Sequence, residues 1–276
     1  MQYRQVNVIS GKGEGPERFR AELRSIAVDD HGHIYAAGDS EIKVFDAAGK
    51  IARRWPTTKP AHSVNIAPEG YVYTGEEGQI EIFDLTGKLI DTWRDEKLLG
   101  RVTAIGFTKD NVLAGDATDR AIRRFDRHGK FLNTIGKDNP VNGLLIPNGV
   151  VNFGVDAQGI IHAANPGKHR VEQYAPDGRL LGHIGRFDGT DPAGFTGCCN
   201  PTNVAIGDAI YTTEKAGPRV KAYDFSGKLL AVIATDFDAN CKNMSIAVDV
   251  RNAAKKRVYV VDTVKLAIHV FEEVAV

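Results

Sequence analysis

Short runs of alternating apolar and polar residues recur along the whole chain, and each run ends at a polar turn. The first set covers residues 25–28, 34–36, 41–45 and 51–53. Alternation over four to six positions, bounded by Gly, Asp, Asn and Pro, is typical of antiparallel β-strands. No segment shows a sustained helical period. The pattern therefore predicts an all-β protein built from short strands.

An aromatic residue followed by a polar turn repeats along the sequence, and its first copy is FDAAGK at residues 45–50. The aromatic residues stand at positions 45, 83, 125, 174, 223 and 271, which are 38 to 49 residues apart. A repeat of this length marks one supersecondary unit per copy. Four strands in each of six copies predict a six-bladed β-propeller of four-stranded antiparallel blades.

The two ends of the chain complement each other in this repeat. The sixth copy stops before its outermost strand, whereas residues 5–11 resemble the outer strands at 131–136 and 181–185. We expect the N-terminal strand to complete the last blade, which closes the ring and removes an exposed edge. Because no linker interrupts the repeat, residues 1–276 are predicted to form a single propeller domain.

Composition and charge narrow the classes of partner. Lys and Arg together number 35, as do Asp and Glu, and the basic residues are scattered, so no nucleic-acid partner is predicted. No apolar run approaches the roughly 18 to 20 residues that span a bilayer. The first residues lack the apolar core of a signal peptide. We expect a soluble chain. Whether it is exported, with a signal peptide that is absent from this chain, is left open.

Residues 162–174, HAANPGKHRVEQY, resemble the repeat unit of NHL-repeat propellers, and residues 219–223, RVKAY, resemble its second half. The resemblance extends over nearly the full chain. It implies the six-bladed scaffold. For activity it implies little, because similar propellers serve as protein-binding or nucleic-acid-binding platforms, signalling ectodomains and, in some cases, metal-dependent lyases or lactonases.

Ligand-binding residues are predicted on the face that carries the mouth of the central channel. The loop entering each innermost strand and the loop between the second and third strands share that face, where polar residues that differ between blades are candidates. The predicted ligand-binding residues are Arg24, His62, Asn148, Asn203, Glu214 and Lys215. The second-to-third-strand loops also hold Glu76, Asp116, Asn165 and Asp262.

Three cysteines, Cys198, Cys199 and Cys241, enter adjacent predicted blades, so their thiols are expected on the same face. A disulfide from Cys198 or Cys199 to Cys241 would tie the two blades together. Three thiolates could instead hold a soft metal or an iron–sulfur cluster, with His62 or Glu214 as a fourth ligand. Buried, inert thiols are the third alternative.

The segment IPNGV at 146–150 looks like an asparagine motif of calcium-dependent lactonases that share the propeller shape. Oxygen ligands suit calcium, which would sit in the central channel, but the glutamate of that pattern is not clear in the first inner strand. The predicted function is therefore a non-catalytic binding module for a small molecule, a metal or a protein. A metal-dependent hydrolase or lyase at the same face, and a redox protein with a thiolate-bound metal or iron–sulfur centre, are the alternatives.

Overall fold

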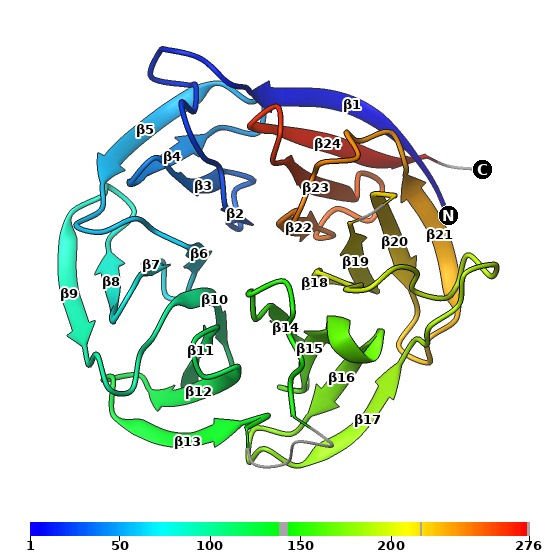
Figure 1. The fold of residues 1–276 in the computed structure, drawn as a ribbon. Helices are drawn as coiled ribbons and strands as arrows, with labels where there is room; N and C mark the ends of the chain where they lie inside the picture. Colours follow the sequence, from blue (N-terminus) through cyan, green and yellow to red (C-terminus); the bar gives the residue numbers. More distant parts are fainter. Residues whose placement is uncertain (138–142, 216, 275–276) are drawn as a thin grey trace. The chain divides into compact units, whose positions relative to one another are not determined.

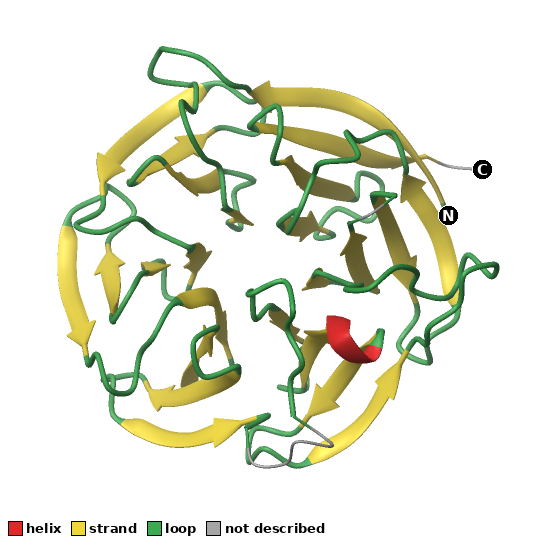
Figure 2. Cartoon of the chain, viewed as in Figure 1, coloured by secondary structure: helices red, strands yellow, loops and turns green. Residues whose placement is uncertain are grey.

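The computed structural model describes residues 1–137, 143–215 and 217–274. Within these residues, strands β1 to β24 form six four-stranded sheets, and the one helical element is a short 3-10 turn, η1 (Pro166–Lys168) (Figure 2). This is a six-bladed β-propeller of antiparallel blades, as the repeat predicted. None of the described helical residues forms a segment long and apolar enough to cross a membrane.

The chain divides into two compact units, residues 1–102 with 244–276 and residues 103–243, which are described separately. The first unit contains blades 1, 2 and 6. Blade 1 is β2 (Ser25–Val28), β3 (Ile34–Gly38), β4 (Glu41–Phe45) and β5 (Ile51–Pro56). Blade 2 is β6 (Ser63–Ile66), β7 (Val72–Gly75), β8 (Gln79–Phe83) and β9 (Leu89–Arg94). Blade 6 is β22 (Ile246–Asp249), β23 (Arg257–Asp262), β24 (Ala267–Val274) and β1 (Gln2–Ser10).

The second unit contains blades 3, 4 and 5 (Figure 1). Blade 3 is β10 (Val102–Phe107), β11 (Asn111–Asp116), β12 (Ala121–Asp126) and β13 (Phe131–Ile135). Blade 4 is β14 (Phe153–Val155), β15 (Ile161–Asn165), β16 (Arg170–Tyr174) and β17 (Leu180–Ile184). Blade 5 is β18 (Asn203–Ile206), β19 (Ile210–Glu214), β20 (Arg219–Tyr223) and β21 (Leu229–Ala234).

Strand β1 closes the ring by pairing with β24 at the edge of blade 6, from Gln2 opposite Val274 to Ser10 opposite Ala267 (Figure 1). Ile9 is buried there in the same apolar cluster as Ile268. The predicted closure by the N-terminal strand is therefore confirmed. An edge that would otherwise present unpaired backbone groups is covered by the other end of the chain.

The repeated polar turn is a structural device. In its first copy the Asp46 carboxylate accepts hydrogen bonds from the backbone N–H groups of Ala48 (3.0 Å) and Lys50 (2.9 Å). Gly49 adopts a φ of 87°, a conformation that side chains disfavour. Asp126 repeats the same contacts with His128 and Lys130. The turn therefore joins the two outer strands of a blade, which explains why its Asp recurs in four copies and its Gly in five.

Candidate functional site

A small polar residue stands at the start of each innermost strand or directly before it; we call these six residues the inner-strand belt. Its members are Ser25, Ser63, Thr103, Asn152, Asn203 and Ser245. In the first unit Ser245 Oγ accepts the N–H of Ile26 (3.1 Å), and Ser25 Oγ accepts that of Val64 (3.1 Å). In the second unit Asn152 Oδ1 accepts the N–H of Val204 (2.7 Å). The sequence analysis missed this belt, although its residues occupy the same repeat position.

Asn203, a predicted ligand-binding residue, belongs to this belt. Its amide donates to Thr202 Oγ1 (3.2 Å) and Thr213 Oγ1 (3.4 Å), and the side chain is buried. Because its donors are satisfied inside blade 5, its contacts favour a structural role.

Arg24 and His62, the two predicted residues of the first unit, lie in contact. The carboxylate of Asp39 holds the preceding loop by accepting the N–H groups of Ala21 (2.9 Å) and Glu22 (3.0 Å). Glu22 then forms an ion pair with Arg24, whose Nη1 hydrogen-bonds His62 Nδ1. The segments that lead into β2 and β6 thereby bring together an acid, a guanidinium and an imidazole that are all partly exposed.

The electrostatics of this cluster keep His62 neutral. The pKa of His62 is lowered from 6.5 to about 4. Burial is the largest cause, and the positive charges of Arg24 and Arg101 follow it. A guanidinium can only donate, so Nδ1 must accept and the ring proton must reside on Nε2. The cluster therefore offers the Arg24 guanidinium and one imidazole N–H donor at neutral pH, and the positive charge of Arg101 acts on it.

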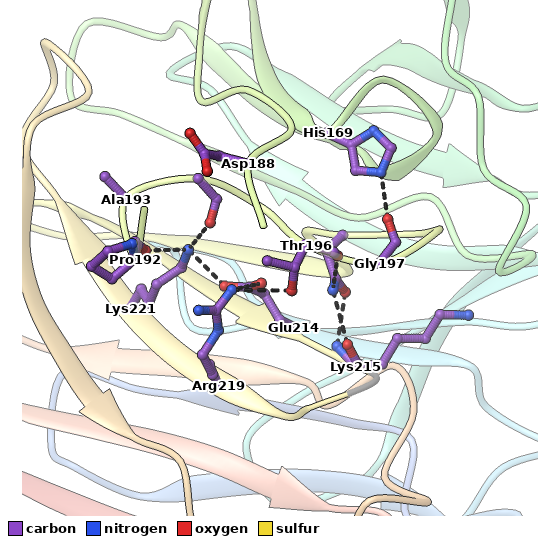
Figure 3. A network of polar contacts seen from close by, with 12 residues as sticks. His169, Asp188, Pro192, Ala193, Thr196, Gly197, Glu214, Lys215, Arg219 and Lys221 are labelled. Carbon is purple, nitrogen blue, oxygen red and sulfur yellow. Dashed lines mark hydrogen bonds and ion pairs between the residues drawn. The ribbon is translucent and has the colours of Figure 1, made fainter. Parts of the chain in front are cut away.

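Glu214 is completely buried in blade 5. Figure 3 shows its carboxylate between Arg219 and Lys221. Its carboxylate forms ion pairs with Arg219 (2.7 Å) and Lys221 (2.7 Å). Lys221 also donates to the carbonyl oxygens of Pro192 (3.0 Å) and Gly194 (2.7 Å). These contacts tie the long loop before β18 to the sheet, so they favour a structural role for Glu214 as well.

Asn148, a predicted ligand-binding residue, contacts Asn243 in the segment before β22. Asn148 Nδ2 donates to Asn243 Oδ1 (2.9 Å). Asn148 Oδ1 is buried and no donor among the described residues reaches it. The side-chain amide of Asn148 therefore has an unused acceptor, which a ligand or water could satisfy.

The disulfide from Cys198 or Cys199 to Cys241, one of the three alternatives, is not formed, because none of the three cysteines is in a disulfide. Cys198 Sγ lies 3.0 Å from Cys199 Sγ, while Cys241 is buried and its backbone N–H donates to Asp238 O (2.9 Å). Lys215, the last predicted ligand-binding residue, lies close enough for its charge to act on both thiols of this pair. The structure thus shows a pair of adjacent thiols and does not confirm a three-cysteine cluster.

A metal site requires several suitable side chains to converge. Within residues 1–137, 143–215 and 217–274, no group of three or more His, Cys, Asp or Glu side chains is arranged to hold a metal ion. The predicted metal site at Cys198, Cys199 and Cys241, with His62 or Glu214 as a fourth ligand, is not confirmed.

A second set of buried polar residues, also missed by the sequence analysis, stands two positions before each repeating aromatic; we call it the blade-core set. Its members are Lys43, Glu81, Arg123, Glu172, Lys221 and His269. Most of them contact the loop residues predicted on the channel face. The pairs are Glu76 with Glu81, Asp116 with Arg123 (3.5 Å), Asn165 with Glu172 (2.9 Å), Glu214 with Lys221 (2.7 Å) and Asp262 with His269 (3.5 Å).

Blade 1 differs from these, since Lys43 pairs with Glu41 (2.6 Å) of the same strand. The five residues predicted on loops are all buried against partners inside their own blades, and four of them are the last residues of strands: Asp116 of β11, Asn165 of β15, Glu214 of β19 and Asp262 of β23, while Glu76 directly follows β7. This arrangement makes them parts of the blade cores.

The comparisons with known proteins find similarity at the level of structure alone. The sequence matches no protein-family profile and no curated protein. The structure is similar to a catalytically inactive histidine-to-alanine variant of virginiamycin B lyase from Staphylococcus aureus with quinupristin. The TM-score is 0.63 at 10% identity, covering 95% of this chain and 82% of that one.

Two further solved structures show the same likeness. A chain of the mitotic checkpoint complex has a TM-score of 0.68 at 10% identity, with 98% of this chain and 92% of that one covered. A protein of unknown function from Bacteroides caccae has a TM-score of 0.60 at 14% identity, with 79% of this chain and 83% of that one covered. Identities this low show the propeller fold that these proteins share with this chain, and nothing finer.

Proposed function

We propose that the protein is a binding module and that the Arg24–His62 cluster recognises an anionic group of its ligand. The ligand is a small molecule or a peptide that carries a carboxylate or a phosphate. Guanidinium groups suit such ligands because their planar array of N–H donors matches the oxygens of both anions.

The contact between Arg24 and His62 carries this proposal. Glu22 and His62 hold the Arg24 guanidinium from two sides, so little conformational freedom is lost when an anion binds. The positive charge of Arg101 also acts on His62. The Glu22 carboxylate offsets the charge of Arg24, and the charge of Arg101 adds a positive potential at His62.

The same geometry favours binding over acid–base catalysis. A general base works best when its pKa lies near the working pH, and the pKa of His62 is about 4. Nδ1 is occupied by Arg24, and Nε2 already carries the ring proton. His62 is thus suited to donate a hydrogen bond to a ligand oxygen.

Isothermal titration with inorganic phosphate and with acetate tests the proposal. The wild-type protein is expected to bind one of these anions, and Arg24→Ala and His62→Ala are each expected to weaken binding about tenfold. Arg54→Ala, which removes an exposed guanidinium of blade 1, is the matched control. Equal affinities in all four proteins, or no binding in any of them, would contradict the proposal.

An NMR titration of His62 sharpens the test. In Arg24→Ala the pKa of His62 is expected to rise, because one positive charge is lost, but to stay below 6.5, because burial is the largest cause of the shift. An unchanged pKa of His62 would show that Arg24 does not act on the imidazole.

A lyase is the second candidate, favoured by the likeness to virginiamycin B lyase, of which a variant with one histidine replaced by alanine is described as catalytically inactive. His62 is a partly exposed histidine that directly precedes an innermost strand. Turnover of a cyclic peptide or lactone that is lost in His62→Ala would support this candidate. The same experiment run with Arg24→Ala separates the roles of the two residues.

We also propose that the chain is an NHL-repeat propeller. The resembling segment spans β15, η1 and β16, and His169 Nε2 contacts Gly197 O (2.6 Å) of the next blade's loop. A structural role for that histidine suits a repeat unit that packs blade against blade. Protein binding is consistent with the likeness to a chain of the mitotic checkpoint complex.

A further inference from the structure

Two neighbouring thiols differ sharply in their surroundings. Cys198 is exposed, whereas Cys199 is buried, and their sulfur atoms lie 3.0 Å apart. At this distance one thiol can attack a bond made by the other after only a small movement. The pair occupies the loop that leads into β18 (Asn203–Ile206) of blade 5.

The loop that carries the thiols is firmly anchored. Asn200 Nδ2 donates to Thr196 O (2.6 Å) and to Lys215 O (2.8 Å), and Asn200 Oδ1 accepts the N–H of Lys215 (2.8 Å). His169 Nε2 hydrogen-bonds the carbonyl oxygen of Gly197 (2.6 Å). Figure 3 shows this contact beside Thr196 and Lys215. These bonds fix the thiol loop against the end of β19, and so they bring Lys215 beside the two sulfur atoms.

Electrostatics assign different roles to the two thiols. The hydrogen bond from Cys199, followed by the charge of Lys215, lowers the pKa of Cys198. Burial, followed by the hydrogen bond to Cys198, raises the pKa of Cys199. The exposed sulfur therefore has more thiolate character, and the thiolate is the nucleophile in thiol chemistry.

We propose that Cys198 and Cys199 form a thiol–disulfide exchange site that reduces a small disulfide. The Cys198 thiolate attacks one sulfur of the disulfide, which forms a mixed disulfide and releases one thiol. Cys199 then loses its proton and attacks Cys198 Sγ, which releases the second thiol and leaves a disulfide between the two cysteines. The substrate gains two electrons and two protons, and the protein loses the same number.

The covalent geometry makes such a disulfide easy to reduce again. Adjacent Cα atoms lie about 3.8 Å apart across a trans peptide, which is below the roughly 4.4 to 6.8 Å usual for a disulfide. A bond formed at this spacing is strained, and strained disulfides are the labile ones. The equilibrium therefore favours the dithiol, so an excess of the small disulfide drives the exchange forward and a modest excess of thiol reverses it.

Reaction of the reduced protein with glutathione disulfide under anaerobic conditions, followed by intact-mass analysis, tests the proposal. The wild-type protein is expected to lose the mass of two hydrogen atoms and to retain no glutathione. Peptide mapping should place both oxidised sulfurs in the peptide that contains Cys198 and Cys199, with Cys241 still a free thiol. A wild-type product that retains glutathione, or a disulfide that includes Cys241, would overturn the proposal.

Serine variants separate the two roles. Cys199→Ser is expected to stop at the mixed disulfide and to retain one glutathione on Cys198. Cys198→Ser is expected to react about tenfold more slowly, since the remaining thiol is buried. Cys241→Ser should behave as the wild type does. If Cys198→Ser reacts as fast as the wild type, Cys198 is not the attacking thiol and the proposal fails.

A lysine variant tests the electrostatic argument. Lys215→Met is expected to slow the first step several-fold at pH 7 and to leave the final product unchanged. Lys228→Met, which removes an exposed lysine from the same blade, is the matched control. Thermal melts of every variant establish that each one is folded, so a slow reaction cannot be attributed to loss of the blade. Equal rates in the two lysine variants would count against the role of Lys215.

Discussion

Blades 2 and 5 carry their buried polar pairs at the same repeat positions and balance the charges in opposite ways. In blade 5, Glu214 faces Lys221 at 2.7 Å and both side chains are completely buried. In blade 2 the equivalent residues are two acids, Glu76 and Glu81, and both are buried as well. The comparison shows that the propeller needs a polar pair at this position but does not prescribe its charge.

The two acids of blade 2 remain compatible because one of them keeps a proton. Burial, followed by the hydrogen bond and the charge of Glu81, raises the pKa of Glu76 to about 8. Gln79 Nε2 donates to Glu76 (2.6 Å), and Thr58 Oγ1 donates to Glu81 (2.6 Å). Blade 2 therefore depends on a titratable proton, while blade 5 depends on a lysine.

Replacement of Lys221 by Met in blade 5 should have the largest effect. The substitution removes the Lys221 ammonium from the buried Glu214 carboxylate, and it removes the donor to two loop carbonyls. We therefore expect the free energy of unfolding to fall by about 3 to 5 kcal/mol. Urea unfolding measures it, with Lys228→Met as the control. A loss below about 1 kcal/mol would show that the buried pair contributes little, as surface pairs do.

The second largest effect is expected from Glu76→Gln in blade 2, and it should depend on pH. Folded Glu76 keeps its proton up to a pH of about 8 whereas unfolded Glu76 loses it near 4.5, so the wild-type stability falls as the pH rises through this window. Gln carries no proton to lose. Relative to wild type, the variant should gain stability on the order of 3 kcal/mol between pH 5 and pH 9.

Unfolding measured at both pH values checks this expectation. Glu77→Gln alters the adjacent, exposed glutamate and serves as the control. Parallel pH profiles for wild type and Glu76→Gln would mean that Glu76 is ionised in the folded protein, and the distinction between the two blades would then disappear.

A smaller effect is expected when blade 2 is given the charge balance of blade 5. In Glu81→Lys the new ammonium faces Glu76, which can then ionise, but the hydrogen bonds from Thr58 to Glu81 are lost. We expect a gain of about 1 kcal/mol at pH 9 and a flat profile between pH 5 and pH 9. A variant that unfolds more readily at both pH values would show that the surroundings of Glu81 cannot accept a cation.

The smallest effect is expected at the rim of the blade 2 network. Arg94 Nε donates to Gln79 Oε1 (3.1 Å) from the exposed side of β9. Arg94→Ala should lower stability by less than about 1 kcal/mol and should leave the pH profile unchanged. A change in the pH profile would place Arg94 among the groups that set the pKa of Glu76.

Sequence reasoning succeeded where a single repeat position has the same role in every blade. The aromatic at positions 45, 83, 125, 174, 223 and 271 recurs in all six copies, and four of the turns that follow it have both the Asp and the Gly. These local signals predicted the blades and the turns. The closure by β1 could also be predicted, because the outer strand missing from the last copy is present at the start of the chain.

The candidate site was predicted less completely. Arg24 and His62 were predicted on the same face, and they lie in contact. Glu214 and Asn203 were predicted there too, but they bind partners inside blade 5. Their partners were available in the sequence: Lys221 stands two positions before the aromatic Tyr223, as its equivalents do in every blade. A polar residue within an apolar strand indicates a buried polar partner. This signal could have located the pairs inside the blades.

The sequence by itself determined the number of blades, the turns between strands and the strand that closes the ring, because these follow from periodicity and from contacts close along the chain. Only the tertiary structure decided which polar side chains are neutralised inside a blade and which remain available. The same structure paired Cys198 with Cys199 and left Cys241 out of that contact. The physical reason is that burial and the charge of distant neighbours fix the state of an ionisable group, and neither can be read from a residue's position in a repeat.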